Sequence, residues 1–564
     1  MQKDDVDSVQ TKGLTFAPII RHYFERCGIA RIIDENVPLD PRRKILSHGQ
    51  ACVAMITGIF CQVLQLYNLC RYAENTTILD VILPNISSRE YFDDRLADTL
   101  DALFKYGLGN LETRITRQMI DSFEIGYDII HNDTTSASVY GRYDQPDTEG
   151  GISITYGFSK KHRKDLKQLI WSLSVSSDHA FPLFQMAYSG NTTDVETYVE
   201  QWQNLIDLLD DREFLYVADS KLVAKGNLSH INDNGGFFLA PVPMYESYKD
   251  VFLTALNDHD AEILIEHKGK LNRGFEVPIT IQYKEQDYEF RMIIIYDHGL
   301  FARKKRTIDR RIEKTKNAFS QLGQKLNKYK LKTYDQINKA CRGILKKYHT
   351  TELFDYQIHN NAVVNYKNKN KGRPPKNREP EKIAVTKDCF SVQIKFNDKA
   401  YQDALYRCGY YPLITNMPKE TFGIEDAMHN HKNQYKSEHI NRRAKGDYNL
   451  EPIYLHKPHR IEAFLLLFKI ALQIIVLIER TGRVNIVQRD KGLDNFRPNR
   501  KDVRNPKTEY LLKEFQYIVS GEIRLSSGDT HYFVSELNEL QKDILEILEV
   551  PLSCFTYEYL FDTS

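Results

Sequence analysis

Three carboxylates, Asp133, Asp219 and Glu438, have sequence surroundings suited to holding divalent metal ions. Asp133 follows a short apolar run that ends at Ile130, and Asp219 ends the unbroken apolar run 214–218. Each run predicts a buried strand that delivers an aspartate to its carboxyl end, where ligands bind in open α/β sheets. Hard cations prefer oxygen ligands, so the chemistry indicated is metal-assisted phosphoryl transfer. Taken singly, each aspartate has the simpler interpretation of a turn or helix-cap residue.

Glu438 lies in a segment rich in cations and amides. Arg442 and Lys445 follow it by four and seven residues, which places one carboxylate and two cations on the same face of a predicted helix. Arg443 adds another cation next to them. A carboxylate among cations is typical of a metal ligand beside a phosphate backbone, although a solvated helix shows the same pattern. We therefore expect Arg442 and Arg443 to contact DNA.

The segment around Glu438 resembles the YREK signature of the DDE transposases of bacterial insertion sequences. In that signature a Tyr, an Arg, the catalytic Glu and a Lys follow one another at fixed helical spacing. Lys445 matches the signature Lys, whereas Gln434 and His431 stand where the family has Arg and Tyr. Because of these two departures, we make no prediction about a hairpin intermediate.

Three further motifs are similar to this family. Asp133, Thr134 and Thr135 match its Asp-Xaa-Thr motif, and the run 157–168 is similar to a Gly-Xaa-Ser-Lys-Xaa-His-Arg run of a long-chain subgroup. Gly190, Asn191 and Asp194 resemble the subgroup's Gly-Asn-Xaa-Xaa-Asp. The likeness extends at a low level over roughly residues 15–550, and the order of the motifs along one chain is more specific than any single one.

The resemblance implies an α/β (α+β) fold with a ribonuclease-H-like core, a large insertion before the catalytic helix, and an N-terminal helical domain. The order of predicted elements from residue 127 to 244, which is three strands, a helix and an acid-bearing strand, agrees with such a core. We predict five regions: 1–120, helical and binding transposon ends; 121–260, the first part of the core; 261–410, an insertion with a β-hairpin, basic helices and a linker; 411–482, the second part of the core; and 483–564, a tail with an amphipathic helix.

The resemblance also implies the reaction and the partners. Two Mg²⁺ or Mn²⁺ ions would be held by Asp133, which bridges them, by Asp219 and by Glu438, with Lys445 contacting a phosphate. The substrates would be terminal inverted repeats and target DNA, and the protein would act as a homodimer or higher oligomer on paired ends. Two alternatives stay open: a hydrolytic nuclease of the same fold, and a catalytically silent DNA-binding descendant of a transposase.

Other cations are weaker candidates for DNA contacts. His162, Arg163 and Lys167 lie in a polar segment after a predicted strand, where they either touch the DNA backbone or solvate the surface. Arg373 belongs to a Gly-Arg-Pro-Pro segment that resembles a minor-groove arm but is also typical of a disordered linker.

Composition permits these interpretations without requiring them. The chain has 564 residues and a net charge of +1, so DNA binding must rest on local basic patches. The 8 Cys form no CxxC pair, which favours reduced thiols over zinc ligands or disulfides. No signal peptide is recognisable, and charged residues interrupt the longest apolar stretch, 461–478, so we expect a buried helix there and a cytoplasmic protein.

Overall fold

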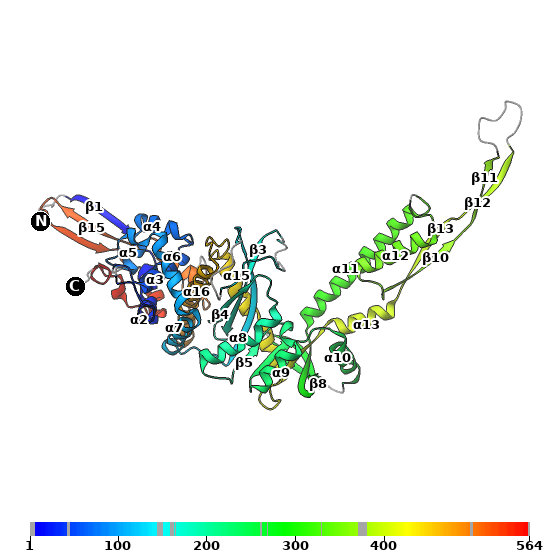
Figure 1. The fold of residues 1–564 in the computed structure, drawn as a ribbon, viewed down its shortest axis with the longest axis horizontal. Coiled ribbons are helices and arrows are strands. Elements are labelled where there is room, and N and C mark those ends of the chain that lie inside the picture. Colours follow the sequence, from blue (N-terminus) through cyan, green and yellow to red (C-terminus); the bar gives the residue numbers. More distant parts are fainter. Residues whose placement is uncertain are drawn as a thin grey trace, which may run out of the picture. The chain divides into compact units, whose positions relative to one another are not determined.

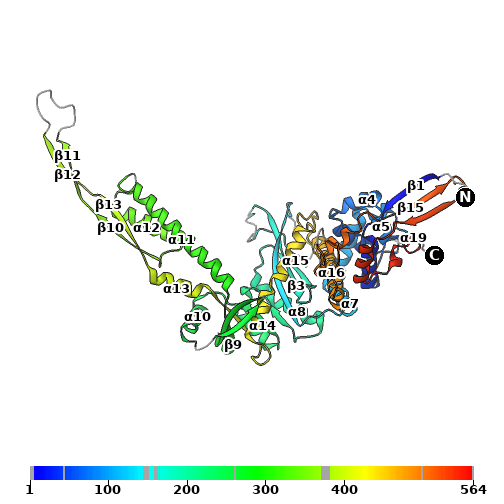
Figure 2. The ribbon, with the colours of Figure 1, turned by 180° about the vertical axis from the view of Figure 1, so that it is seen from behind.

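The computed structural model describes residues 6–41, 45–143, 151–157, 163, 165–259, 262–267, 269–328, 330–369, 381–496 and 500–561. The chain divides into two compact units. Figures 1 and 2 show the ribbon from two sides, with colours that follow the sequence from blue to red. The first unit comprises Met1–Pro243, Thr280–Arg291 and Ile414–Ser564, and the second comprises Met244–Ile279 and Met292–Leu413. Both have mixed α/β character.

The first unit begins with a strand, which the sequence did not predict, and continues with the expected helices. Ser47 caps one of them through a capping box with Gln50, as its sequence suggests. The elements are β1 (Val6–Gly13), α1 (Ala17–Cys27), α2 (Ile29–Asn36), α3 (His48–Phe60), α4 (Leu66–Asn75), α5 (Ile78–Ile82), η1 (Ser88–Tyr91), α6 (Asp93–Tyr106) and α7 (Leu108–Phe123).

A mixed sheet follows, in which five neighbouring strands lie in the order β4-β3-β2-β5-β6. β2 is antiparallel to β3 and parallel to β5, and β5 is parallel to β6. Helix α8 leads back from β4 to β5, so the predicted order of three strands, a helix and a further strand is confirmed. The bounds are β2 (Ile129–Val139), β3 (Lys167–Ser176), β4 (Pro182–Ser189), α8 (Asp194–Leu209), β5 (Leu215–Val217), η2 (Ser220–Val223), α9 (Lys225–Asp233) and β6 (Phe237–Pro241).

Three helices late in the chain complete this part of the unit: α14 (Ile424–Lys432), α15 (Tyr435–Gly446) and α16 (Pro458–Gln488). Among the described residues, α16 is the one helix long and apolar enough to cross a membrane, but 94% of its apolar window is buried inside the protein. Phe468 meets Trp171 of β3 edge to face, with ring centroids 6.3 Å apart. The expectation of a buried core helix at 461–478 is therefore confirmed.

The C-terminal region is more ordered than the predicted tail with one amphipathic helix. Strand β15 pairs with β1 and with β16 in a three-stranded sheet, which joins the two ends of the chain. The buried hydroxyl of Tyr23 donates to the carbonyl oxygen of Leu548 at 3.1 Å. The elements are α17 (Thr508–Lys513), β15 (Val519–Leu525), β16 (Thr530–Val534), α18 (Glu539–Ile547), η3 (Leu552–Phe555) and α19 (Tyr557–Phe561).

The second unit holds most of the predicted insertion, including its basic helices, whereas residues Thr280–Arg291 at the turn of the predicted β-hairpin belong to the first unit. Strands Phe354–Asn360 and Phe390–Phe396 pair with each other within this unit. The elements are α10 (Glu246–Asp258), β7 (Ile263–His267), β8 (Lys270–Tyr283), β9 (Gln286–Tyr296), α11 (His298–Lys325), α12 (Tyr334–Tyr348), β10 (Phe354–Asn360), β11 (Val363–Asn368), β12 (Lys382–Lys387), β13 (Phe390–Phe396), α13 (Asp398–Cys408) and β14 (Tyr410–Thr415).

Candidate active site

Asp133 lies within β2, and Asp219 follows the neighbouring parallel strand β5. β2 pairs with β5 from Ile129↔Leu215 to His131↔Val217, and each aspartate lies two residues beyond that last pair. Adjacent strands are about 5 Å apart, and residues in register point to the same face of a sheet. The two carboxylates are thus neighbours, although 86 residues separate them in sequence.

The position of Asp133 within its strand corrects one expectation. β2 does not end at Asp133 but continues to Val139, and Asp133 pairs with Leu173 of β3. The run Thr134–Val139 stays extended because β3 supplies its hydrogen-bond partners, whereas β5 stops at Val217. The edge of β2 that faces β5 therefore opens where Asp133 stands.

Asp219 follows β5, at the carboxyl end of the strand as predicted. Its Oδ1 accepts hydrogen bonds from the Tyr198 hydroxyl at 2.6 Å and from the backbone N–H of Lys221 at 2.9 Å. The second bond caps η2, so the helix-cap interpretation is also correct. Oδ2 has no hydrogen-bond partner in the described part of the chain and stays available to a ligand.

Helix α15 packs against β2. Three side chains at the start of α15 or within it bond to successive residues on one face of that strand. Gln434, just before α15, contacts His131 and Asn132; Asn441 contacts Asp133; and Lys445 contacts Thr135. The Gln434 amide nitrogen donates to the carbonyl oxygen of Asn132 at 2.7 Å. Asn441 Nδ2 donates to Asp133 Oδ2 at 3.0 Å. We call Gln434, Asn441 and Lys445 the α15 row.

Glu438 has a helical spacing that matches the α15 row, because it follows Gln434 by four residues and precedes Asn441 by three. Its side chain is exposed and makes no hydrogen bond or ion pair with any residue that the structure describes. A carboxylate placed among cations without a partner has its full coordinating capacity free. The structure thus puts the predicted glutamate on the helix that docks at Asp133.

Lys445 is a member of the α15 row, and protein oxygens already surround its ammonium group. Nζ donates to Thr135 Oγ1 and to the carbonyl oxygen of Ser136, both at 2.6 Å, and lies 3.4 Å from Glu451 Oε1. The main contribution of Lys445 in this conformation is to fix α15 on β2. A phosphate contact would have to replace the Glu451 carboxylate.

Gln434 and His431 stand where the YREK signature has Arg and Tyr, and both point into the protein. Because the Gln434 amide nitrogen faces Asn132, its oxygen faces His131, and the 3.1 Å contact assigns the proton of His131 to Nδ1. Burial lowers the pKa of His131 to about 4, although Gln434 opposes the shift, and burial lowers the pKa of His431 to about 4 as well. Both imidazoles are neutral at pH 7, so neither brings a cation to the site.

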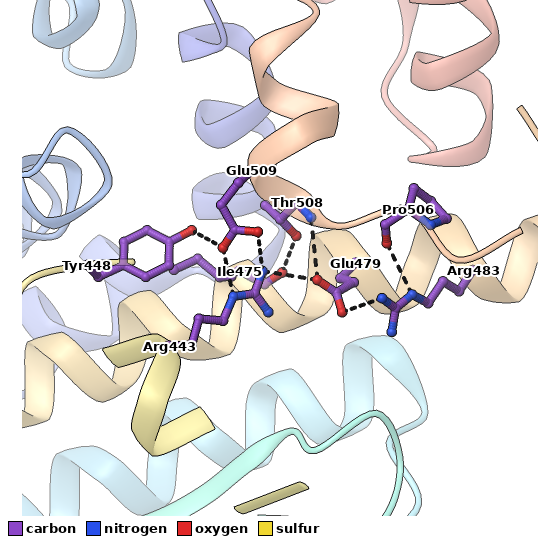
Figure 3. A network of polar contacts seen from close by, with 8 residues as sticks. All are labelled: Arg443, Tyr448, Ile475, Glu479, Arg483, Pro506, Thr508 and Glu509. Carbon is purple, nitrogen blue, oxygen red and sulfur yellow. Dashed lines mark hydrogen bonds and ion pairs between the residues drawn. The ribbon is translucent and has the colours of Figure 1, made fainter. Parts of the chain in front are cut away.

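Arg442 and Arg443 have different roles, which corrects the expectation for Arg443. Arg442 is exposed and makes no hydrogen bond or ion pair among the described residues, so it is free to meet a phosphate. Arg443 is buried, and its guanidinium group contacts Glu479 at 3.0 Å and Glu509 at 2.7 Å (Figure 3). Arg443 therefore ties α15 to α16 and α17 and does not face DNA.

The network around Arg443 is closed by further bonds. Tyr448 donates to Glu509 at 2.9 Å, and Arg483 contacts the second oxygen of Glu479 at 2.7 Å (Figure 3). Burial alone would raise the pKa of Glu509, but Arg443 outweighs it and the pKa is lowered. Every charge in the network has a partner, as buried charges require.

The remaining predicted DNA contacts are in part engaged locally. Arg163 pairs with Asp165 at 2.7 Å on the surface. Lys167 donates to the carbonyl oxygens of Arg142 and Tyr143. His162 and Arg373 lie outside the described residues.

The donor set fits a hard cation by its chemistry. The three acids offer carboxylate oxygens, and the buried Asn441 Oδ1 beside Asp133 has no hydrogen-bond partner among the described residues. The described chain contains no group of three or more His, Cys, Asp or Glu side chains already gathered as a metal cage. Asp133 and Asp219 would hold the ion in the sheet, and Glu438 would complete the site from α15.

Sequence reasoning missed Asn441 and the inward role of Gln434. Gln434 precedes Glu438 by four residues and Asn441 follows it by three, and this spacing was the available signal, since it places all three on one helical face. Both are uncharged amides among cations, so their residue types alone do not indicate a role in a metal site.

Residues 9–117 match the model of a domain of unknown function, DUF4277, a domain found in transposase-like proteins. The match covers most of β1 and helices α1 to α7 and stops before β2. No curated protein matches the chain.

Proposed function

We propose that this protein is a DNA transposase of an insertion sequence, which cleaves DNA at element ends by metal-assisted phosphoryl transfer and joins the 3′-hydroxyl ends to target DNA. The observation that carries the proposal is that Asp133 and Asp219 each lie two residues beyond the last pair of the neighbouring strands β2 and β5, with α15, the helix of Glu438, bonded to Asp133. The DUF4277 match at the N-terminus supports it independently.

The sheet supports a ribonuclease-H-like core. Its first strand, β2, lies in the middle of the order β4-β3-β2-β5-β6, with only β3 antiparallel to both of its neighbours. In this proposed core the long insertion separates the sheet from α15, which explains the 219 positions between Asp219 and Glu438.

The chemistry needs a nucleophile placed in line with a leaving oxygen. Two divalent ions about 4 Å apart supply both activation and charge stabilisation when they are bound. Asp133 would bridge them, with Asp219 and Glu438 holding one ion each. In the first step water displaces the 3′-oxygen of one strand, and in the second that 3′-hydroxyl displaces an oxygen of a target phosphodiester.

The other residues position these groups. Asn441 donates a hydrogen bond to one oxygen of Asp133, which restrains the orientation of that carboxylate. Gln434 and Lys445 hold α15 at two points on either side, which fixes the height of Glu438 above the strand. Arg442, exposed one turn after Glu438, would contact the phosphate next to the scissile bond.

The partners follow from the reaction. Joining two ends to one target requires two active sites, so the proposed working form is a homodimer or higher oligomer on paired ends. The proposed location is the bacterial or archaeal cytoplasm, where the element's DNA is found.

The test uses plasmid DNA that contains the coding region with its native flanks. We expect purified protein to nick at the element ends with Mg²⁺ or Mn²⁺ but not with EDTA. Asp133→Asn, Asp219→Asn and Glu438→Gln should each abolish nicking and keep DNA affinity. Glu420→Gln, an exposed carboxylate without a partner among the described residues, is the matched control and should cut normally.

The outcomes separate the alternatives. Cutting by any one of the three variants would remove that residue from the site. Nicking without joining of pre-cleaved ends would favour the hydrolytic nuclease. DNA binding without any nicking would favour a silent descendant.

A further inference from the structure

The second unit contains one long two-stranded antiparallel ribbon. β10 pairs with β13, and β11 pairs with β12, in the same uninterrupted register. Asn361 bonds to Cys389 between the two pairs, and Lys369 bonds to Glu381 beyond them, both at 2.8 Å. The ribbon therefore runs from residues 354 and 396 to residues 369 and 381, over about 50 Å.

Only the first half of this ribbon is covered. Phe354, Phe390 and their neighbours on one face of β10–β13 pack with α11 and α12 around a shared hydrophobic core. Beyond it, the β11–β12 half continues past the ends of both helices (Figure 1). Every residue of β11 is exposed, and Val385 is the one residue of β12 that is partly buried.

The uncovered half carries apolar side chains on both faces. Val364 and Tyr366 continue the face that packs on the helices, yet they are 52% and 70% exposed. Val363 and Ile383 lie on the opposite face and are also exposed. An isolated two-stranded ribbon is marginal in water, so apolar residues on both faces indicate a partner that surrounds the ribbon.

The charge of this segment identifies the partner's chemistry. Residues 298–396, which include α11, α12 and the ribbon, contain 25 Lys and Arg against 8 Asp and Glu, a net charge of +17, while the whole chain carries +1. Lysines lie on both faces of the β11–β12 half, at positions 367, 382 and 387. Such local excess in a nearly neutral chain matches a polyanion.

We propose that the β11–β12 ribbon, residues 363–369 and 381–387, inserts into the major groove of duplex DNA while exposed cations of α11 and α12 contact the phosphates. Two strands with their side chains need about 10 Å, which the major groove of about 12 Å admits and the minor groove of about 6 Å does not. A groove has walls on both sides, which accounts for apolar and basic residues on both faces. Double-stranded RNA is disfavoured because its major groove is too narrow.

This inference deepens the proposed function by naming how the DNA is held, but it concerns binding without metal. DNA affinity is therefore measured in EDTA, by fluorescence anisotropy of the full-length chain with a labelled B-form duplex. Failure of cleavage would leave this measurement unchanged, so the two proposals can fail separately.

Two ribbon variants test it. One neutralises lysines: Lys367→Gln, Lys369→Gln, Lys382→Gln and Lys387→Gln. The other replaces apolar residues: Val363→Ser, Val364→Ser, Tyr366→Ser and Ile383→Ser. The control for the first neutralises four exposed lysines of the first unit: Lys491→Gln, Lys501→Gln, Lys513→Gln and Lys542→Gln.

We expect the lysine variant to lose about tenfold or more in affinity and to lower the slope of log affinity against log salt by about three. The apolar variant should lose affinity with little change in that slope, and the control should bind like the wild type. Methyl green, a major-groove ligand, should compete with the protein, and netropsin, a minor-groove ligand, should not. Circular dichroism should show the same fold throughout, since the altered side chains lie outside the core.

Three results would overturn the inference. Wild-type affinity in both ribbon variants would show that the ribbon does not bind DNA. Stronger binding to an RNA duplex of the same sequence would exclude B-form groove insertion. Dissociation of an oligomer by the apolar variant, with DNA affinity unchanged, would assign the ribbon to a second copy of the chain.

Discussion

Asn441 and Asp133 are joined by a hydrogen bond of 3.0 Å from the amide nitrogen of the first to a carboxylate oxygen of the second. The bond links α15, which carries Glu438, directly to the strand that carries the first proposed metal ligand. It also restrains the carboxylate, because a donor bound to one oxygen limits the rotation of the group. The proposed site therefore depends on an uncharged amide as well as on three acids.

Replacing Asn441 should slow cleavage without weakening DNA binding. Asn441→Ala removes the donor that orients Asp133, and losing a residue that orients a metal ligand typically costs about 10–100-fold in activity or metal affinity. The measurement is the nicking rate as a function of Mg²⁺ concentration, with DNA affinity measured in parallel. Asn110→Ala, an exposed asparagine of α7, is the control and should leave both unchanged. A normal rate at limiting metal in Asn441→Ala would show that the bond has no part in the site.

Arg442 and Arg443 should give opposite phenotypes although they are neighbours. Arg443→Ala leaves Glu479 and Glu509 without their shared cation, which should cost about 3 kcal/mol or more of unfolding free energy. Arg442→Ala should change stability by less than about 0.5 kcal/mol. It should instead weaken DNA binding and lower the salt slope by about one. Urea denaturation and salt titration of binding test both, and an unstable Arg442→Ala would contradict the assignment.

The buried pair Glu112 and Lys469 should make stability depend on pH in a defined direction. The two side chains lie 3.3 Å apart inside the first unit, and burial raises the pKa of Glu112 to about 7. In the unfolded chain this carboxyl has an ordinary pKa near 4.5. Protonated Glu112 therefore stabilises the fold at low pH, and that contribution is lost as the pH rises from about 4.5 to about 7.

The comparison with Glu112→Gln isolates this effect from other titrating groups. The difference in unfolding free energy, wild type minus variant, should fall across that pH window in urea denaturation. A difference that stays flat or rises would contradict the assignment. Lys469→Met alone should destabilise the protein by about 3–5 kcal/mol, and the double variant with Glu112→Gln should recover much of that loss.

Local patterns predicted several features because their causes are local. The apolar run that ends at Asp219 became β5 and its exit, and Ser47 became the cap of α3. The apolar stretch at 461–478 became a buried helix, since its length and composition demand a core. In each case the residues that set the structure are adjacent in sequence.

Other features depended on partners distant in sequence. β3 keeps Asp133 in the middle of a strand, although the polar residues after it suggested an end. Glu479 and Glu509 make Arg443 internal, while Arg442 stays outside. The pattern of charges on α15 could not separate the two arginines, because burial is decided by which elements pack on each face.

The sequence by itself determined the types of group available for chemistry: three carboxylates, a basic insertion and the helical spacing that places Glu438 with Gln434, Asn441 and Lys445. Tertiary structure alone decided that β2, which contains Asp133, pairs with β5, which precedes Asp219, and that an amide donates to Asp133. It also decided which half of the long ribbon is covered. Strand pairing and packing bring together residues hundreds of positions apart, and no local preference encodes such contacts.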